Sequence, residues 1–196
     1  WDCGAITTGP VTVPLVLALG IGVRNFWRAQ APGAASGAAL AEATHDVLRL
    51  KYLGGGHGDG CNNEDDAFSN ARRRAHHLTF FGFLLCFAAT SVGTVYHYGF
   101  GWVAPYVFTA VPKLLGIVGG VMLSLGTAGL WRLHRRRHPL QGDPAQSTMD
   151  RGFIALLFLT ALTGLVLTAL RHTGALALLL SVHLGAVMAL FATAPY

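Results

Sequence analysis

Charged residues are scarce in this chain of 196 residues. They make up 12% of it and hydrophobic residues 53%, whereas a soluble domain averages roughly 25% charged residues. A formal net charge of +5 is typical of a nucleic-acid-binding protein only where the basic residues share one face of a soluble fold. Here they lie between apolar runs, so the composition indicates a protein of the lipid bilayer and no nucleic-acid partner is expected.

Cysteine is scarce as well. Cys3, Cys61 and Cys86 lie far apart, which excludes a disulfide framework and any Cys-x-x-Cys metal or iron–sulfur motif. A redox centre must therefore use other ligands, and Cys86 receives no role. No signal peptide is recognisable, and because the chain starts at Trp1 and stops inside an apolar run, we expect both ends to be cuts in a longer protein.

Long apolar runs are what the sequence has in abundance. A membrane-spanning helix needs about 20 mostly apolar residues, and five stretches qualify: residues 3–23, 76–98, 114–131, 152–170 and 173–196. Pro10 and Pro14 predict that the first helix is broken or kinked, and Gly116, Gly119 and Gly126 offer a small face for close helix packing. We predict an all-α integral membrane protein, a bundle of about five transmembrane helices.

The basic residues predict how the bundle is oriented. Twelve of the fourteen Lys and Arg residues lie between the first and second spans or between the third and fourth, and only Lys113 and Arg171 fall on the other side. Cytoplasmic loops are enriched in Lys and Arg, so we place the N-terminus outside and the C-terminus inside. This divides the chain into a first, broken span (1–23), a cytoplasmic Gly-rich loop (24–75) and a four-helix membrane region (76–196).

The cytoplasmic loop is the only sizeable soluble part. Its Ala- and Gly-rich start, residues 31–41, is typical of a linker, and residues 42–53 are expected to form a short surface helix. His57 and Cys61 have a metal-like spacing, but two ligands do not make a metal site, and no Gly-Lys-Ser/Thr follows the glycines, which excludes a P-loop. We expect this segment to dock a soluble partner through Gly54, Gly55, Gly56, His57 and Cys61.

The nine histidines are the candidate functional residues. Polar side chains in hydrocarbon are costly unless they are paired or ligated, and neutral imidazole is a common axial ligand of haem iron. His76 and His77 begin the second span and His97 ends it. At about 100° per residue, His97 lies within about 60° of His76, and about 31 Å from it along the helix axis. This arrangement suits one haem near each membrane surface.

His172 and His183 are the corresponding residues of the fifth span. They lie about 20° apart around the helix axis and about 16 Å apart along it, and His183 is in mid-span. The alternatives stay open: His97 and His172 fit ordinary interfacial residues, and His183 fits a hydrogen bond to a neighbouring helix. His134 and His138 belong to a basic cluster that is typical of a membrane anchor.

From about Arg24 onward the sequence resembles the membrane half of the tricarballylate (citrate) utilisation protein B family. The resemblance is carried by these segments: Leu50-Lys51-Tyr52-Leu53-Gly54-Gly55-Gly56, Gly60-Cys61-Asn62, Arg72-Arg73, His76-His77, residues 82–90, Gly93-Thr94, Ala104-Pro105-Tyr106, Asp150, residues 156–160, Leu162-Thr163-Gly164 and Val182-His183-Leu184-Gly185. Residues 1–23 look instead like a segment of a different, uncharacterised membrane family.

The resemblance implies a two-part electron carrier. Its N-terminal ferredoxin-like half, with iron–sulfur clusters, is absent from this chain, and its membrane half is similar to the gamma subunit of respiratory nitrate reductase and holds haem b. Such a protein passes electrons from a cytoplasmic, flavin-dependent tricarballylate dehydrogenase to quinone in the bacterial inner membrane. By position, His76 or His77 and His183 become the leading iron ligands, with His97 next. In the family, the last span continues beyond the last residue of this sequence to a further histidine. That histidine is the expected second iron ligand beside His76 or His77.

Two other functions fit the same residues. The broken first span is typical of transporters, whose discontinuous helices build substrate sites, although Asp2 is the only carboxylate near a span on the outer side. A membrane anchor without redox activity would use the loop of residues 24–74 only to dock its partner. On the electron-transfer interpretation the chain is a component of an oxidoreductase system and is not a catalyst by itself.

Overall fold

The computed structural model describes residues 37–50, 69–136 and 146–193, and the secondary structure of this part of the chain is helical, without a strand. The expected first span (1–23) and the docking segment from Gly54 to Cys61 lie outside the described residues. In chain order the elements are α2 (Gly37–Arg49), α3 (Ala71–Thr94), the π-helix η2 (Val95–Gly99), α4 (Val111–Arg136), α5 (Gln146–Leu170) and α6 (Leu176–Thr193).

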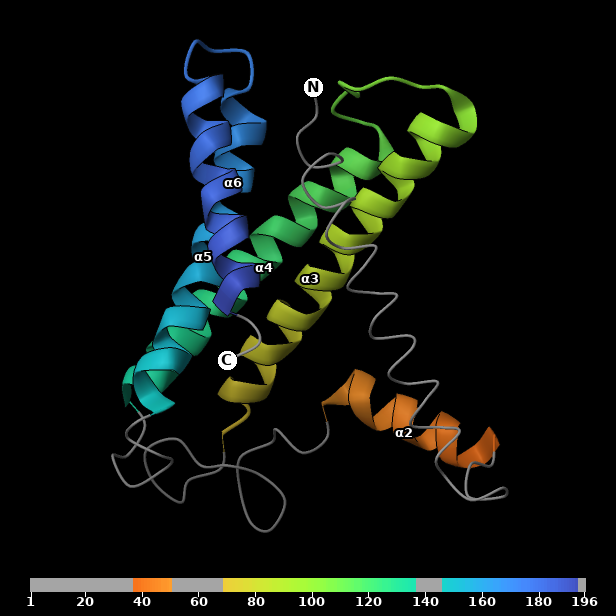
Figure 1. Ribbon diagram of the computed structural model, residues 1–196. Coiled ribbons are helices and arrows are strands. Elements are labelled where there is room, and N and C mark those ends of the chain that lie inside the picture. Colours follow the sequence, from red (N-terminus) through yellow and green to blue (C-terminus); the bar gives the residue numbers. More distant parts are fainter. Residues whose placement is uncertain (1–36, 51–68, 137–145, 194–196) are drawn as a thin grey trace.

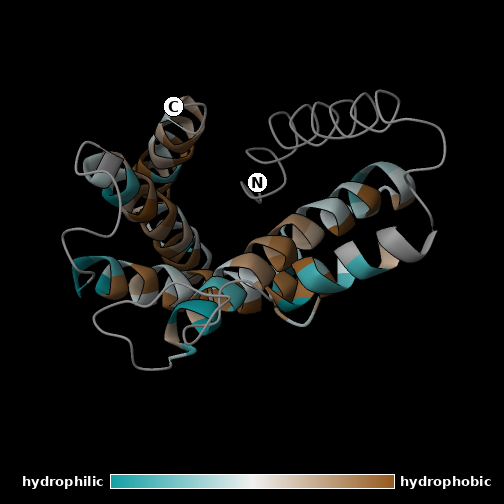
Figure 2. Ribbon diagram, turned by 90° about the horizontal axis from the view of Figure 1, so that it is seen from below, coloured by the Kyte–Doolittle hydropathy of each residue, from teal (hydrophilic) through white to brown (hydrophobic). Residues whose placement is uncertain are grey.

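Within the described ranges, four helices are long and apolar enough to cross a bilayer: Ala71–Gly99, Val111–Arg136, Ser147–Leu170 and Leu176–Thr193. They confirm the second to fifth predicted spans and make this a multi-pass membrane protein. Hydrophobic residues predominate along all four (Figure 2), and many large apolar side chains on their outer faces are exposed, among them Leu125, Leu178 and Met188. Such exposure is expected where lipid, and not water, surrounds the protein.

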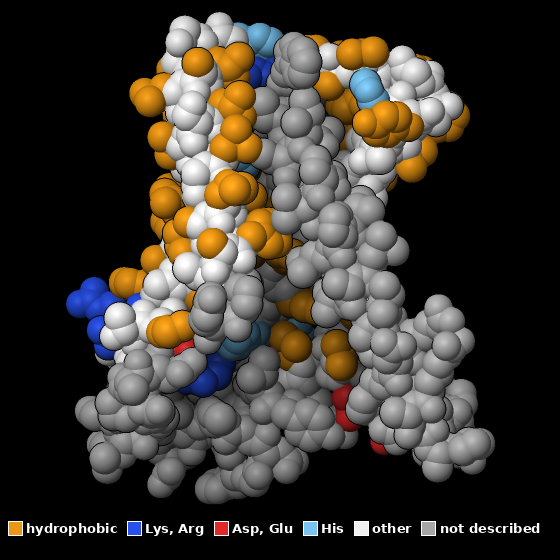
Figure 3. Space-filling model, in the orientation of Figure 1, with side chains coloured by type: hydrophobic (Ala, Val, Ile, Leu, Met, Phe, Trp, Pro, Cys, Tyr) orange, Lys and Arg blue, Asp and Glu red, His pale blue; other side chains and the backbone are white. Residues whose placement is uncertain are grey.

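Consecutive helices pack against each other, so α4 contacts both α3 and α5, and α5 contacts α6. Figure 1 shows α3 and α4 as one antiparallel pair and α5 and α6 as another, and the two pairs diverge toward the end where α4 and α6 begin. We call this the lysine end, after Lys113, which lies there with Arg171. The opposite, arginine-rich end carries most of the described basic side chains (Figure 3), namely Arg72, Arg73, Arg74, Arg132, Arg135, Arg136 and Arg151.

Glycines set the distance between α3 and α4. A Cβ atom on Gly126 would lie 2.5 Å from the backbone nitrogen of Thr79, and one on Gly82 would lie 2.5 Å from the backbone nitrogen of Leu123. Only glycine leaves room for backbones this close, which is how helices gain dispersion contacts where lipid is as apolar as the side chains. The small face that we expected on this span therefore packs on α3.

Helix α2 begins earlier than the sequence pattern indicated. We expected a linker up to residue 41 and a helix over residues 42–53, but the helix spans Gly37–Arg49. The linker interpretation is wrong for the end of that stretch because alanine, which fills it, has the highest helix propensity of all residues. The helix ends at Arg49, and the next residue, Leu50, has a φ of 46° in the left-handed region that stops a helix.

The connection between α3 and α4 returns the chain across the lysine end. The backbone N–H of Trp102 donates to the carbonyl of Tyr96 at 2.9 Å, and the hydroxyl of Tyr106 lies 3.2 Å from the carbonyl of Gly93. The Tyr96 ring makes edge-on contacts with the rings of Trp102 and Tyr106, at centroid distances of 5.0 and 5.7 Å. This segment therefore fixes the start of α4, and with it Lys113.

Candidate functional site

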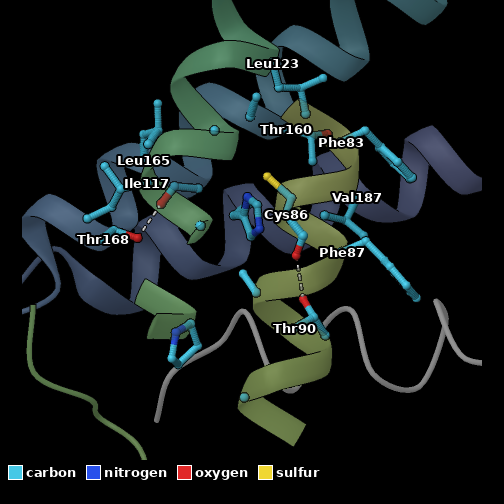
Figure 4. Close-up of a pocket in the computed structure, with 18 of the residues that line it drawn as sticks. Phe83, Cys86, Phe87, Thr90, Ile117, Leu123, Thr160, Leu165, Thr168 and Val187 are labelled. Carbon is cyan, nitrogen blue, oxygen red and sulfur yellow. Dashed lines mark hydrogen bonds between the residues drawn. The ribbon is translucent and has the colours of Figure 1, made fainter. Parts of the chain in front are cut away.

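A cavity of about 270 Å³ lies between the two helix pairs and is lined by residues of α3, α4, α5 and α6. We call it the His183 cavity. Its wall is mostly apolar, and Figure 4 shows Phe83 and Phe87 from α3 on one side, Leu165 and Thr168 from α5 on the other, and the sulfur of Cys86 directed into the space. Its polar groups are therefore few.

Among the described residues that line this cavity, His183 is the only histidine. It lies in the middle of α6, is 9% exposed, and its Nδ1 is 2.9 Å from the hydroxyl oxygen of Thr163 on α5. The Thr163 hydroxyl also lies 2.7 Å from the carbonyl of Leu159. Because a hydroxyl has a single proton and the carbonyl can only accept it, the Thr163 oxygen accepts from His183. The hydrogen-bond geometry thus assigns the proton to Nδ1 and leaves a lone pair on Nε2.

Gly164 makes room for this imidazole. A Cβ atom on Gly164 would lie 3.2 Å from Cε1 of His183, closer than ordinary van der Waals contact. The segment Thr163-Gly164 therefore does two things: the threonine accepts the hydrogen bond from the ring, and the glycine lets the ring approach the backbone of α5 closely. The hydrogen bond to a neighbouring helix, which we kept as an alternative role for His183, is present.

The lysine end of the same cavity carries positive charge. Lys113 lines the cavity, is 8% exposed and lies in the first turn of α4. Its Nζ is 4.2 Å from the centre of the Phe108 ring. The guanidinium carbon of Arg171, at the end of α5, is 5.6 Å from the same ring, and Nη2 of Arg171 lies 3.4 Å from the carbonyl oxygen of Tyr106.

A second cavity, of about 680 Å³, lies at the arginine-rich end, and we call it the His76 cavity. It is lined by residues of α3, α4 and α5 and by Thr193 of α6. His76 and His134 both line it, as do Arg72 and Asp150. Nε2 of His134 lies 3.3 Å from the hydroxyl oxygen of Ser147, which ties the end of α4 to the start of α5.

The three other predicted ligands lie outside both cavities. His77 is half-buried with its ring 5.8 Å from that of Phe81, and its Nε2 has no hydrogen-bond partner in the described part of the chain. His97 is exposed in the π-helix, its ring against Tyr98. His172 is exposed too, and its Nε2 accepts a hydrogen bond of 3.0 Å from Nε of Arg171.

The angle of about 20° between His172 and His183 was expected for two residues on one helix, and the structure does not place them on one helix. We expected the last span to begin near residue 173, but α6 begins at Leu176 and His172 lies in the turn that precedes it. The turn residues Thr173 and Gly174 both disfavour a helix interior. For His97 the count of 100° per residue fails as well, because the hydrogen bonds of a π-helix span five residues in place of four.

Sequence reasoning missed three residues that line the cavities. Cys86 received no role, Lys113 served only to orient the bundle, and His134 was interpreted as part of a basic anchor; the first two line the His183 cavity and the third lines the His76 cavity. A signal was present for Lys113, since a lone cation at the start of an apolar run is costly unless it is used. Neither Cys86 nor His134 carried a comparable signal.

Comparison with known proteins identifies the family of this chain. The family model for citrate utilization protein B matches residues 5–196. The chain belongs to the citrate utilization protein B family. The match starts at residue 5 and so includes most of residues 1–23, where the sequence had indicated a different membrane family.

One curated relative shows how much of such a protein this chain represents. The citrate utilization protein B of Escherichia coli is 56% identical to the chain over 184 residues. That alignment covers 92% of the chain and 48% of the relative, so the chain spans about half the length of this relative. No solved structure matches the chain.

The residues of the two cavities fit a haem group in their chemistry, though not equally in space. Each cavity has at least one imidazole in its wall, His183 in one and His76 in the other, and the assigned tautomer of His183 leaves Nε2 available as an iron ligand. The His76 cavity, at about 680 Å³, has the volume of an ordinary ligand pocket, roughly 300–1,000 Å³. The His183 cavity, at about 270 Å³, is smaller.

Proposed function

We propose that this chain is the membrane electron-transfer part of a citrate or tricarballylate utilisation system. It relays electrons from a cytoplasmic flavin-dependent dehydrogenase, by way of iron–sulfur clusters outside this chain and haem b within it, to quinone in the bacterial inner membrane. Support comes from the family, whose name refers to citrate utilization, and from four helices in the described part of the chain that are apolar enough to cross a bilayer.

The observation that carries the proposal is the environment of His183. A buried imidazole in mid-span is costly, and the hydrogen bond of its Nδ1 to Thr163 offsets only part of that cost because Nε2 keeps its lone pair. Metal-ligating histidines commonly donate their other ring N–H to a fixed acceptor, which orients the ring and raises its basicity as a ligand. Haem b, when bound, would supply a one-electron carrier, and His183 would hold its iron.

His76 is the second proposed ligand. It lies at the arginine-rich end of the bundle, in a cavity of its own, so that the two histidines would serve separate haem groups, one near the arginine-rich surface and one in the middle of the spans. Arg72, one helical turn before His76, lines the same cavity and provides a cation for acidic substituents of the bound group. At His183 the smaller cavity requires the helix pairs, which already diverge toward the lysine end, to separate further.

The direction of electron flow follows from the charge distribution. The arginine-rich end faces the cytoplasm on the positive-inside rule, which brings the His76 cavity to the side of the soluble dehydrogenase. We place the docking of that partner on the loop with Gly54, Gly55, Gly56, His57 and Cys61. Quinone then takes the electrons within the bilayer.

Visible spectroscopy of the purified protein tests the proposal. Reduction with dithionite is expected to produce the α-band of a b-type haem, and His183→Ala is expected to remove the contribution of the His183 site. His172→Ala is the matched control, since His172 is exposed and lies outside the His183 cavity. A protein without any α-band, or a His183→Ala variant with an unchanged spectrum, contradicts the assignment.

A further inference from the structure

The connection between α3 and α4 exposes apolar side chains where a loop in water would be polar. No Lys, Arg, Asp or Glu lies between Arg74 and Lys113, and Figure 3 shows hydrophobic side chains gathered at the lysine end of this helix pair. Exposed apolar patches of this kind mark contact sites for a membrane or for another protein. Six large apolar or aromatic residues of the connection are each more than half exposed: Tyr98, Phe100, Trp102, Val103, Val107 and Phe108.

We propose that residues 98–108 form a lipid-binding loop that inserts into the bilayer at the lysine end, between the headgroups and the acyl chains. The exposed side chains favour hydrocarbon. The backbone N–H groups of Val103, Ala104 and Val107, however, donate to no residue in the described part of the chain, and in the hydrocarbon core they would be unsatisfied. The headgroup boundary meets both demands, because water reaches the amides there and Trp and Tyr rings are enriched at this depth.

Ring contacts hold the loop in one shape before it meets lipid. Tyr96 and Tyr106 are half-buried and form its base, with their rings 5.7 Å apart. The exposed Phe100 ring lies 6.3 Å from that of Tyr96 and 5.4 Å from that of Trp102. Because these rings are already fixed against one another, little conformational freedom is lost when Phe100 and Trp102 enter the lipid.

The length of α3 favours the same depth. The stretch from Ala75 to Gly99 carries no Lys, Arg, Asp or Glu and is about 37 Å long at 1.5 Å per residue, longer than a hydrocarbon core of roughly 30 Å. A span that is too long tilts in the bilayer, and in Figure 1 α3 runs at an angle to α5 and α6. Tilting keeps the far end of α3, and the loop that follows it, at the membrane surface.

Fluorescence quenching of Trp102 at known depths tests the proposal. The full chain carries three other tryptophans, so a variant with Trp1→Phe, Trp27→Phe and Trp131→Phe keeps Trp102 alone. This variant is reconstituted into phosphatidylcholine vesicles whose acyl chains are brominated at successive depths, and quenching by acrylamide from the water is measured beside it. The matched control adds Trp102→Phe and His172→Trp, which moves the single tryptophan to the exposed turn between α5 and α6 at the same end.

We expect brominated lipids to quench Trp102 most strongly about 15 Å from the bilayer centre, at the edge of the hydrocarbon core. Acrylamide is expected to quench Trp102 less than it quenches the tryptophan of the control. The proposal is overturned if acrylamide quenches both alike and lipid does not quench Trp102, since the loop then lies in water. It is also overturned if neither quencher reaches Trp102, which would mean that a protein, such as a second copy of this chain, covers the loop.

A second measurement decides the outcome if the variant with a single tryptophan does not fold. In a chain whose native cysteines are replaced, a nitroxide attached at Val103→Cys reports its depth through its relative accessibility to oxygen and to a water-soluble nickel complex. Greater accessibility to oxygen supports insertion, and greater accessibility to the nickel complex contradicts it. Neither measurement requires bound haem, so the lipid-binding loop and the proposed electron-transfer role stand or fall separately.

Discussion

The Nδ1 atom of His183 and the hydroxyl oxygen of Thr163 lie 2.9 Å apart and join α6 to α5. The contact falls inside the bilayer region of both helices, where a hydrogen bond between neighbouring helices has no competition from water. Because the Thr163 hydroxyl donates its proton to the carbonyl of Leu159, the contact favours the tautomer of His183 with the proton on Nδ1. In the proposed function, Thr163 thereby orients His183 for iron binding.

Removing this hydroxyl is expected to weaken haem binding without removing the ligand. Thr163→Val leaves His183 Nδ1 without its acceptor, and loss of such a supporting group typically costs about 10–100-fold in metal affinity. Titration of the haem-free variant with haem b measures the effect. Thr163→Ser retains the hydroxyl and is expected to bind as the parent does.

A matched control for Thr163→Val is Thr168→Val, a nearby position on the same helix. The Thr168 hydroxyl also lines the cavity, but its hydrogen bond is donated to the carbonyl of Gly164, and it is not the acceptor for Nδ1 of His183. If both valine variants bind haem equally well, the role given to Thr163 is wrong.

The packing of α3 on α4 makes a separate prediction about stability. Gly126→Ala places a Cβ atom 2.5 Å from the backbone nitrogen of Thr79, so the helices must separate, and we expect a loss of about 1–3 kcal/mol. Thermal denaturation in detergent measures this as a lower melting temperature. Gly185→Ala on α6 is the control, because a Cβ there meets nothing within 4 Å; equal melting temperatures for the two variants would argue against close helix packing.

The histidines outside the cavities are expected to be dispensable for haem. His97→Ala removes an exposed ring, so we expect its pyridine haemochrome content to equal that of the parent protein. His76→Ala is expected to lower the content, because His76 lines the cavity at the arginine-rich end. The assignment of ligands has to be revised if His97→Ala lowers the haem content and His76→Ala leaves it unchanged.

Orientation in the membrane is open to labelling. In a chain whose native cysteines are replaced, His172→Cys marks the lysine end and Arg136→Cys the arginine-rich end, and both positions are exposed. The positive-inside rule predicts that an impermeant maleimide reacts with the first in intact cells and with the second only after permeabilisation. The reverse pattern inverts the topology and the proposed direction of electron flow.

Part of this architecture could be predicted from the sequence because it depends on local composition. Apolar length identified the four described spans, and the glycines of α4 indicated a close helix contact. Element boundaries were less accurate: the alanines before Glu42 extend α2 forward, and Thr173 and Gly174 keep His172 out of α6. In both places single-residue helix propensity overrode the broader pattern.

The cavities could not be predicted in the same way. That His183 shares a cavity with Lys113, and His76 another with His134, depends on how three helix contacts combine, and no spacing within one helix encodes it. The π-helix at Val95–Gly99 also turns His97 to a different direction from the one that a rotation of 100° per residue predicts. Residue type identified the candidates, and tertiary packing sorted them.

The measurement that tests the central claim most directly is the dithionite-reduced minus oxidised spectrum of the purified protein, recorded beside that of His183→Ala, with pyridine haemochrome quantification of both. We predict a b-type α-band in the parent protein and a lower haem content in the variant, at a similar yield of folded protein. A parent protein with no haem, or a variant with the full content, would contradict a role for His183 in holding an electron carrier.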